Sequence, residues 1–175
     1  MNQSTPQTPH FIPFVQHRIT PEISQRAMGA LIGSAIGDAL GAPFEFGPAD
    51  QYSTQFPQPV LGGIGEMIGG GSFSWEPAEF TDDTQMTLAL AESLVACGGL
   101  DLDDLWARFV AWRAGATDVG IATSRALSAA DRHEAAMNDA ADPGRSASNG
   151  ALMRTWAIAL AYIGHSTEEV MHVAF

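Results

Sequence analysis

Lysine is absent from this chain of 175 residues, whose eight basic residues are all arginines. The absence excludes catalysis through a lysine Schiff base and the binding of phosphate by a P-loop lysine. The 20 acidic residues give a formal net charge of −12, and such a charge repels the phosphate backbone of nucleic acids. We therefore expect no nucleic-acid partner.

Cysteine is almost absent. Cys97 is the single one, so no internal disulfide can form and a reducing compartment is favoured. The first ten residues are polar and lack the apolar region of a signal peptide. The most apolar stretch, Ala27 to Leu40, is short for a membrane-spanning helix and contains Asp38. These features predict a cytoplasmic protein with no membrane partner.

Convincing strand patterns are also lacking, so helical periodicity is the main signal and the predicted class is all-α. Residues 1–21 hold four prolines among Gln, Thr and Ser, and we expect a flexible or loosely docked arm there. One domain is expected over residues 22–175. The predicted helices cover Glu22–Gly41, Asp82–Ala96, Leu102–Gly115, Gly120–Ala136, about Ser148 to Ile163, and Glu168 onward with Thr167 as its cap.

The first predicted helix carries glycines at every fourth position, on one face of the helix. Such a stripe lets another helix or a ligand approach closely, and helix packing is the favoured interpretation. Asp38 lies near the end of this helix, either as a hydrogen-bond acceptor or as a residue that supports a site. The four glycines are Gly29, Gly33, Gly37 and Gly41.

The segment Thr81-Asp82-Asp83-Thr84 starts the second predicted helix and permits two interpretations. Thr81 is a good helix cap, and acidic residues in a first turn interact favourably with the helix dipole. A hydroxyl and two carboxylates are also hard oxygen ligands for Mg²⁺ or Mn²⁺. The local pattern leaves both open, and the glycine-rich loop directly before it (Gly62 to Gly71) shifts the balance towards a metal site.

Two further segments offer reactive or binding groups. Glu45 lies between Phe44 and Phe46, surroundings that would raise its pKa and suit acid–base chemistry, although a plain surface glutamate is equally compatible. Ser148-Asn149-Gly150 precedes an apolar segment, where its backbone N–H groups can receive a phosphate or its side chains can cap a helix. Arg154 follows one turn later and can pair with an acid or a phosphate.

Four segments, in this order, resemble the ADP-ribosylglycohydrolase family. They are Gly29 to Gly41 with Glu45, Thr81 to Leu90, Asp118-Val119-Gly120 with Thr123, and Ser148 to Arg154. The resemblance implies the N-terminal part of an all-α bundle that binds two Mg²⁺ or Mn²⁺ ions. It also implies hydrolysis of the glycosidic bond between ADP-ribose and a modified protein side chain or small acceptor.

The resemblance also implies which residues act. The expected metal ligands are Thr81, Asp82 and Asp83, and the expected catalytic residues are Glu45, Asp82 and Asp83. A carboxylate would help to protonate the leaving group, as in other glycoside hydrolases. The expected substrate-binding residues are Gly69, Gly70, Gly71, Ser148, Asn149 and Gly150.

One feature of the family is missing from this chain. Members are usually longer and carry a second acidic motif, Asp-x-Asp-Thr or Asp-x-Asp-Ser, which completes the two-metal site, and no such motif occurs here. We therefore expect a truncated chain with exposed apolar faces, and a second chain as a source of the missing half. The alternative is a non-catalytic ADP-ribose-binding module or a degenerate helical module.

Overall fold

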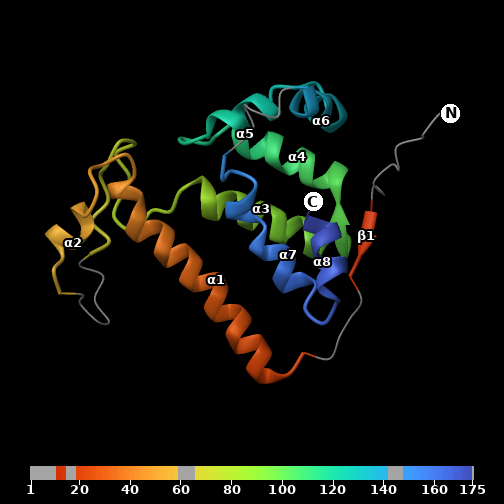
Figure 1. Ribbon diagram of the computed structural model, residues 1–175, viewed down its shortest axis with the longest axis horizontal. Coiled ribbons are helices and arrows are strands. Elements are labelled where there is room, and N and C mark those ends of the chain that lie inside the picture. The colour runs from red at the N-terminus through yellow and green to blue at the C-terminus, as the bar shows by residue number, and fades with distance from the viewer. Residues whose placement is uncertain (1–10, 15–18, 59–65, 142–147, 175) are drawn as a thin grey trace.

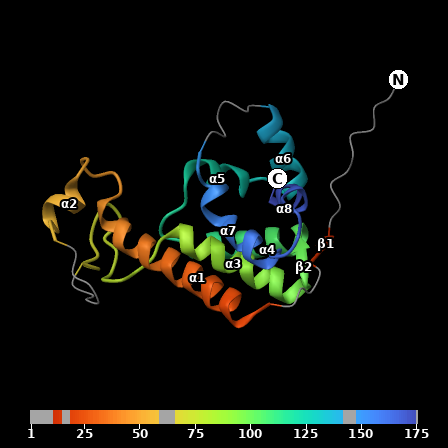
Figure 2. The ribbon, with the colours of Figure 1, turned by 60° about the horizontal axis from the view of Figure 1, so that its bottom comes forward.

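Helices dominate the structure, and the predicted all-α class is confirmed. This computed structural model describes residues 11–14, 19–58, 66–141 and 148–174. Figures 1 and 2 show a helical body, and a long helix, α1, that leads from this body to a small lobe containing α2. The elements in chain order are β1 (Phe11–Pro13), α1 (Pro21–Gly41), the 3₁₀ turn η1 (Ala42–Phe44), α2 (Gln51–Gln55), α3 (Asp82–Cys97), β2 (Gly99–Asp101), α4 (Leu102–Arg113), α5 (Ile121–Ala126), α6 (Arg132–Ala141), the 3₁₀ turn η3 (Leu152–Arg154), α7 (Trp156–Ala161) and α8 (Thr167–Ala174).

The core forms around α3, which contacts α1, α4, α7, η3 and β2. Met86, Leu90 and Leu94 follow one another at a spacing of four residues, so they lie on one face of α3. Each of the three is at most 2% exposed. Phe109 from α4 and Tyr162 after α7 pack against this face. The start of α3 is therefore held by a packed helix, which gives the acidic residues at that start a fixed position.

Two short strands correct the expectation that the chain has none. β1 pairs antiparallel with β2, and Ile12 lies opposite Leu100. The buried hydroxyl of Tyr162 secures this pair, because it donates to the Ile12 carbonyl and accepts from the Leu100 N–H. Phe11–Pro13 is thus docked on the helical body, although it belongs to the predicted arm. Residues 1–10 and 15–18 of that arm lie outside the described residues.

Several predicted helix boundaries are wrong. The predicted helix Gly120–Ala136 is two helices, α5 and α6, and Asp131 caps the second by accepting from the His133 and Glu134 N–H groups at 2.9 Å. The predicted helix from Ser148 begins instead as a turn and η3, and becomes α-helical only in α7. The last helix is capped by Ser166, one residue before the predicted cap, because the Ser166 hydroxyl accepts from the Glu169 N–H at 3.2 Å.

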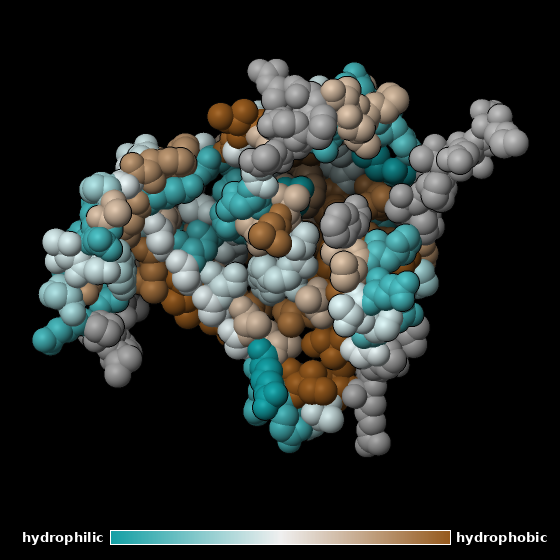
Figure 3. All heavy atoms as spheres, in the orientation of Figure 1, coloured by the Kyte–Doolittle hydropathy of each residue, from teal (hydrophilic) through white to brown (hydrophobic). Residues whose placement is uncertain are grey.

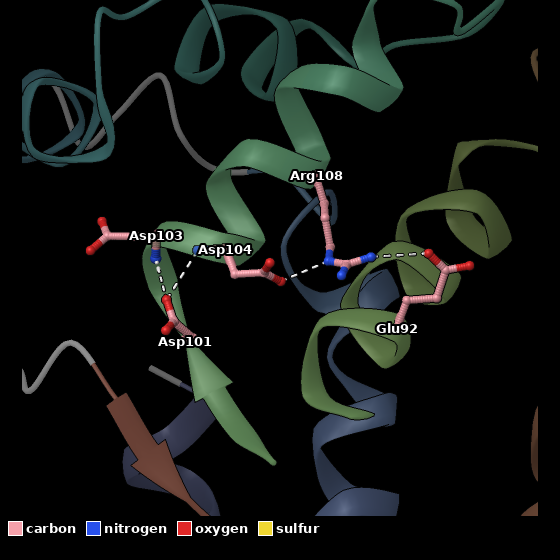
Figure 4. A network of polar contacts seen from close by, with 5 residues as sticks. All are labelled: Glu92, Asp101, Asp103, Asp104 and Arg108. Carbon is pink, nitrogen blue, oxygen red and sulfur yellow. Dashed lines mark hydrogen bonds and ion pairs between the residues drawn. The ribbon is translucent and has the colours of Figure 1, made fainter. Parts of the chain in front are cut away.

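Polar contacts join α3 and α4 at the surface (Figure 4). Asp101 caps α4, since its Oδ1 accepts from the Asp103 and Asp104 N–H groups at 3.0 Å each. Arg108 of α4 pairs with Asp104 at 2.7 Å and with Glu92 of α3 at 3.2 Å. Because these groups are partly exposed, each pair stabilises the fold by at most about 1 kcal/mol. The buried face of α3 is therefore the main link between the two helices.

The length of α1 corrects the expectation that its apolar stretch is too short for a membrane. The continuous helical segment Pro21–Phe44 has 24 residues and a mean hydropathy of 1.3, which is enough by length and composition to cross a bilayer. Ala39 is the one buried residue of α1. A Cβ added to any glycine of the stripe would meet no atom within 4 Å, so among the described residues nothing packs closely against it. The face of α1 that the sequence marks for close packing is open here.

Candidate active site

Asp38, near the end of α1, holds the start of α3. Its Oδ2 accepts from the Thr81 N–H at 3.0 Å, the Thr84 N–H at 3.1 Å and the Thr84 hydroxyl at 2.6 Å. Its Oδ1 accepts from the Thr81 hydroxyl at 2.8 Å. Both threonines are buried, at 3% and 5% exposure. Asp38 is therefore a hydrogen-bond acceptor, at the start of α3 rather than at the end of its own helix. Its role in supporting a site stays a prediction, and its bonds to Thr81 are compatible with that role.

Thr81 is the N-cap of α3, because its hydroxyl oxygen accepts from the Asp83 N–H at 3.3 Å. The capping interpretation is therefore correct for Thr81. Thr81 and Asp38 thus bond the N–H groups of Asp83 and Thr84 in the first turn. The Asp83 carboxylate accepts from the Thr81 hydroxyl at 3.4 Å and Asp82 bonds the Gly120 N–H, so each carboxylate keeps accepting positions for a further partner.

Asp82 and Asp83 are crowded by other carboxylates. Asp82 is 8% exposed, and its pKa is raised to about 6, first by burial and then by the charges of Asp118 and Asp83. The backbone N–H of Gly120 bonds Asp82 and acts in the opposite direction. The pKa of Asp83 is also raised, first by burial and then by Asp38. Such a concentration of negative charge favours a cation or bound protons.

Asp118, in the loop between α4 and α5, belongs to this group although the sequence analysis gave it no role. Its pKa is raised by burial and by the charge of Asp38, and it raises the pKa values of Asp82 and Glu45. The motif Asp118-Val119-Gly120 was part of the family resemblance, which was the signal available in the sequence. Its side chain could not be placed beside Asp82 without knowing how the α4–α5 loop folds.

The donor set fits one side of a magnesium or manganese site. The hydroxyl of Thr81 and the carboxylates of Asp82 and Asp83 are hard oxygen ligands on a single helix start. Within the described parts of the chain, no three Asp, Glu, His or Cys side chains are grouped closely enough to hold an ion by themselves. An octahedral ion would therefore need further ligands from water, substrate or another polypeptide. The binding of two Mg²⁺ or Mn²⁺ ions stays a prediction.

Glu45 sits in a tight turn directly after α1 and η1. The Gly47 N–H donates to the Phe44 carbonyl at 3.0 Å, and Glu45 has φ −59° and ψ 138°. Phe46 has φ 64°, so the angles match a type II turn with Phe46 at the third position, where glycine is preferred. A side chain there costs about 1 kcal/mol or more. Glu45 is exposed, and its pKa is raised, first by partial burial and then by Asp118, Asp83 and Asp38.

The described end of the glycine-rich loop packs against this turn. Gly69, Gly70 and Gly71 have φ values of 66°, 90° and 72°, a left-handed conformation that glycine adopts without strain. Gly70 exchanges backbone hydrogen bonds with Trp75 at 2.7 and 2.9 Å. Gly71 touches the backbone of Pro43, two residues before Glu45. The loop thus supports the Glu45 turn, and its part in substrate binding stays a prediction; residues 59–65 of the loop lie outside the described residues.

Replacing Gly71 by alanine should destabilise the chain by about 2 kcal/mol or more. A Cβ at this position would lie 2.8 Å from the Cα and the carbonyl oxygen of Pro43, and the backbone is left-handed. Gly70→Ala is the matched control, because φ is also positive but no atom lies within 4 Å, so we expect only about 1 kcal/mol of backbone strain. Urea unfolding of both variants measures the difference. Equal losses would show that Gly71 does not need its contact with Pro43.

The Ser148–Gly150 turn approaches the carboxylates through Arg154. The guanidinium of Arg154 donates to the Gly150 carbonyl at 2.6 Å and lies 4.9 Å from the centre of the Phe109 ring. Its pKa is lowered by burial, an effect that the nearby Asp82 carboxylate opposes. A Cβ on Gly150 would be 3.1 Å from the Thr123 hydroxyl, so the turn also lies against α5. The motifs that contain Asp82, Asp118 and Arg154 therefore meet around Asp82. The motif on α1 joins them through the hydrogen bonds of Asp38 to the start of α3.

Comparison with known proteins identifies close relatives. A family model described as ADP-ribosylglycohydrolase matches residues 19–175. The chain is 38% identical to the ADP-ribosyl-(dinitrogen reductase) glycohydrolase of Rhodospirillum rubrum, over 85% of this chain and 48% of that protein. It is 37% identical to an ADP-ribosylarginine hydrolase of Serratia proteamaculans, over 76% of this chain and 36% of that protein.

A solved structure described as an ADP-ribosylglycohydrolase-related protein complex has the same fold. It matches with a TM-score of 0.63 and 33% identity, over 89% of this chain and 48% of that chain. The chain thus spans about half the length, or less, of the relatives that it matches.

Proposed function

This chain belongs to the ADP-ribosylglycohydrolase family, and we propose that it supplies one half of an active site that hydrolyses the bond between ADP-ribose and a modified side chain. The observation that carries the proposal is the meeting of separate motifs around one buried carboxylate. The charges of Asp83, Asp118 and Glu45 each raise the pKa of Asp82. Arg154 interacts with the charge of Asp82 and donates to the Gly150 carbonyl in the Ser148–Gly150 turn. The identity of the acceptor and the dependence on a metal ion are likewise proposed.

The roles follow from the chemistry of each group. Glu45 is exposed at a turn, and its raised pKa suits it to hold a proton for the leaving group. Thr81, Asp82 and Asp83 would hold Mg²⁺ or Mn²⁺. When bound, such an ion orients hydroxyls and lowers the pKa of water. Backbone N–H groups of the glycine loop and of the Ser148–Gly150 turn would receive the diphosphate. Arginine is the proposed acceptor, because two of the related proteins are named ADP-ribosylarginine hydrolases.

A second polypeptide segment would complete this site. Figure 3 shows hydrophobic side chains along the course of α1, and Leu31, Ile32 and Ile36 are each at least 36% exposed. A groove of about 350 Å³ lies between α1, the segment from Met67 to Phe80, and α3, and Thr84 is among the residues that line it. We propose that this groove receives a helix that brings further carboxylates to Asp82 and Asp83. Exposed apolar side chains that line a groove are typical of a surface that packs against another protein segment.

A non-catalytic ADP-ribose-binding module is the second candidate function. The observation that favours it is the incomplete set of metal ligands among the described residues. In this case the chain would bind ADP-ribose without hydrolysing a glycosidic bond, and its affinity for ADP-ribose would not depend on a divalent ion. Both candidates predict binding of ADP-ribose, so the metal dependence separates them.

Calorimetric titration of the full chain with ADP-ribose, in Mg²⁺ and in EDTA, tests the proposal. We expect binding in Mg²⁺ that weakens about tenfold or more in EDTA and in Asp82→Ala, because a charged ligand of the ion is lost. Asp139→Ala, at an exposed position on α6, is the charge-matched control and should bind like the natural chain. Equal affinity with and without Mg²⁺ would support the binding module, and no binding of ADP-ribose would overturn both functions.

A further inference from the structure

The turn that carries Glu45 also presents an aromatic ring to solvent. Phe46 is 73% exposed, and its backbone has φ 64°, in the region that favours glycine. A phenylalanine in the left-handed region gains little from burial at this exposure, so the fold alone does not account for it. Exposed aromatic side chains held in strained turns are typical of residues that contact a ligand.

Phe46 is the outer member of a row of three aromatic rings. The ring of Phe46 lies 6.3 Å from that of Phe73 at an angle of 58°, and Phe73 lies 5.6 Å from Trp75 at 43°. Trp75 is 4% exposed and is bonded to Gly70 through its backbone. The row therefore begins at the glycine loop and ends beside Glu45. The contact with Phe73 limits the positions that the Phe46 ring can occupy. A ring that is already ordered loses less conformational freedom when it binds a ligand.

The position of this ring suits contact with a cationic acceptor. Glu45 directly precedes Phe46 in the same turn, so a group that lies on the exposed Phe46 ring is also close to the Glu45 residue. An exposed aromatic face is a surface on which a guanidinium or ammonium group can stack. A neutral acceptor would not gain this cation–π contact.

We propose that Phe46 determines acceptor specificity by stacking on the guanidinium of an ADP-ribosylated arginine while Glu45 faces the bond to be cleaved. The inference rests on the proposed function and adds to it a residue that contacts the acceptor. Phe46 would have no contact with the ADP-ribose part. Its replacement should therefore change the affinity for the acceptor and leave the affinity for free ADP-ribose unchanged.

Three ligands and three variants test the inference. Dissociation constants are measured in Mg²⁺ for free ADP-ribose, an ADP-ribosylarginine peptide and an ADP-ribosylserine peptide of the same sequence. The natural chain should bind the arginine peptide about fivefold more tightly than the serine peptide. Phe46→Leu should remove this preference, and Phe46→Tyr should keep it. Phe11→Leu, at an exposed position on β1 away from the site, is the matched control and should keep it as well.

Folding is checked with Phe46→Gly, which places the preferred residue at the third position of the turn. Its melting temperature should equal or exceed that of the natural chain, while the preference for the arginine peptide is lost. A preference that survives in Phe46→Leu and Phe46→Gly would overturn the inference and leave the proposed function intact. Loss of free ADP-ribose binding in Phe46→Leu would overturn it too, by placing Phe46 against ADP-ribose. No binding of ADP-ribose by the natural chain would overturn the proposed function and the inference together.

Discussion

Replacing Asp38 by alanine should lower the free energy of unfolding by about 3–5 kcal/mol, the largest loss that we expect from a single substitution. The carboxylate accepts four hydrogen bonds from Thr81 and Thr84, whose donors are buried. Removing it leaves these donors without a partner in a place that water reaches poorly. Urea unfolding followed by circular dichroism measures the loss. Because Thr81 and Asp83 depend on this anchor, Mn²⁺ binding should weaken in the same variant.

Two further variants separate the hydrogen bonds from the helix. Asp38→Asn keeps one accepting oxygen, so it should lose less stability than Asp38→Ala. It should still lose some, because the Asn side chain cannot accept from all four donors. Ser34→Ala, at an exposed position on the same helix, should change stability by less than about 0.5 kcal/mol. If Asp38→Ala lost no more than Ser34→Ala, the hydrogen bonds of Asp38 would not be what links α1 to α3.

Replacing Asp82 by asparagine should stabilise the metal-free chain at pH 7.5 by about 2–3 kcal/mol. The pKa of this carboxyl is raised from 3.8 to about 6 in the folded chain, so the folded chain holds the proton more tightly than the unfolded chain does. The stability that Asp82 contributes is complete below about pH 4 and is lost as the pH rises to about 6. Asparagine is neutral at every pH and avoids that loss. The melting temperature should rise by about 5–10 °C.

The pH and metal dependence of the two melting temperatures checks this prediction. Near pH 4 the two chains should melt at similar temperatures, and the advantage of Asp82→Asn should grow up to about pH 6. At pH 7.5, added Mg²⁺ should stabilise the natural chain and have little effect on Asp82→Asn, because binding to the folded state stabilises it. An asparagine variant that melts lower than the natural chain at pH 7.5 would show that Asp82 is stabilised as an anion without a metal.

The sequence predicted the helical class and the positions of the main motifs, because both depend on local patterns. Thr81 as a cap and α3 as an amphipathic helix are local features, and both are observed. The Asp38 contacts depend on how α1 and α3 meet, and the bonded residues are 43 and 46 positions apart in the sequence. A pattern of neighbouring residues cannot predict a contact over such a separation. Asp118 belongs to a motif that the sequence shows, but its place near Asp82 depends in the same way on the α4–α5 loop.

The errors have physical causes of the same kind. β1 and β2 have three residues each, too few for an alternating pattern, and the Tyr162 hydroxyl from a distant part of the chain bonds both. The helix predicted from Gly120 to Ala136 has good periodicity, but Asp131 caps a new helix and divides it. In each case a tertiary contact or a side-chain bond overrides the local preference.

The release of ADP-ribose from an ADP-ribosylarginine peptide tests the central claim most directly. The full chain is mixed, in Mg²⁺, with a polypeptide that spans the remaining half of the Rhodospirillum rubrum relative, and free ADP-ribose is measured by chromatography. We predict that the mixture releases ADP-ribose, and that release stops in EDTA and when the chain carries Asp82→Ala. Asp139→Ala should leave release unchanged. A mixture that binds ADP-ribose but releases none, or release that is the same with Asp82→Ala, would contradict the assignment of this chain as half of a metal-dependent hydrolase site.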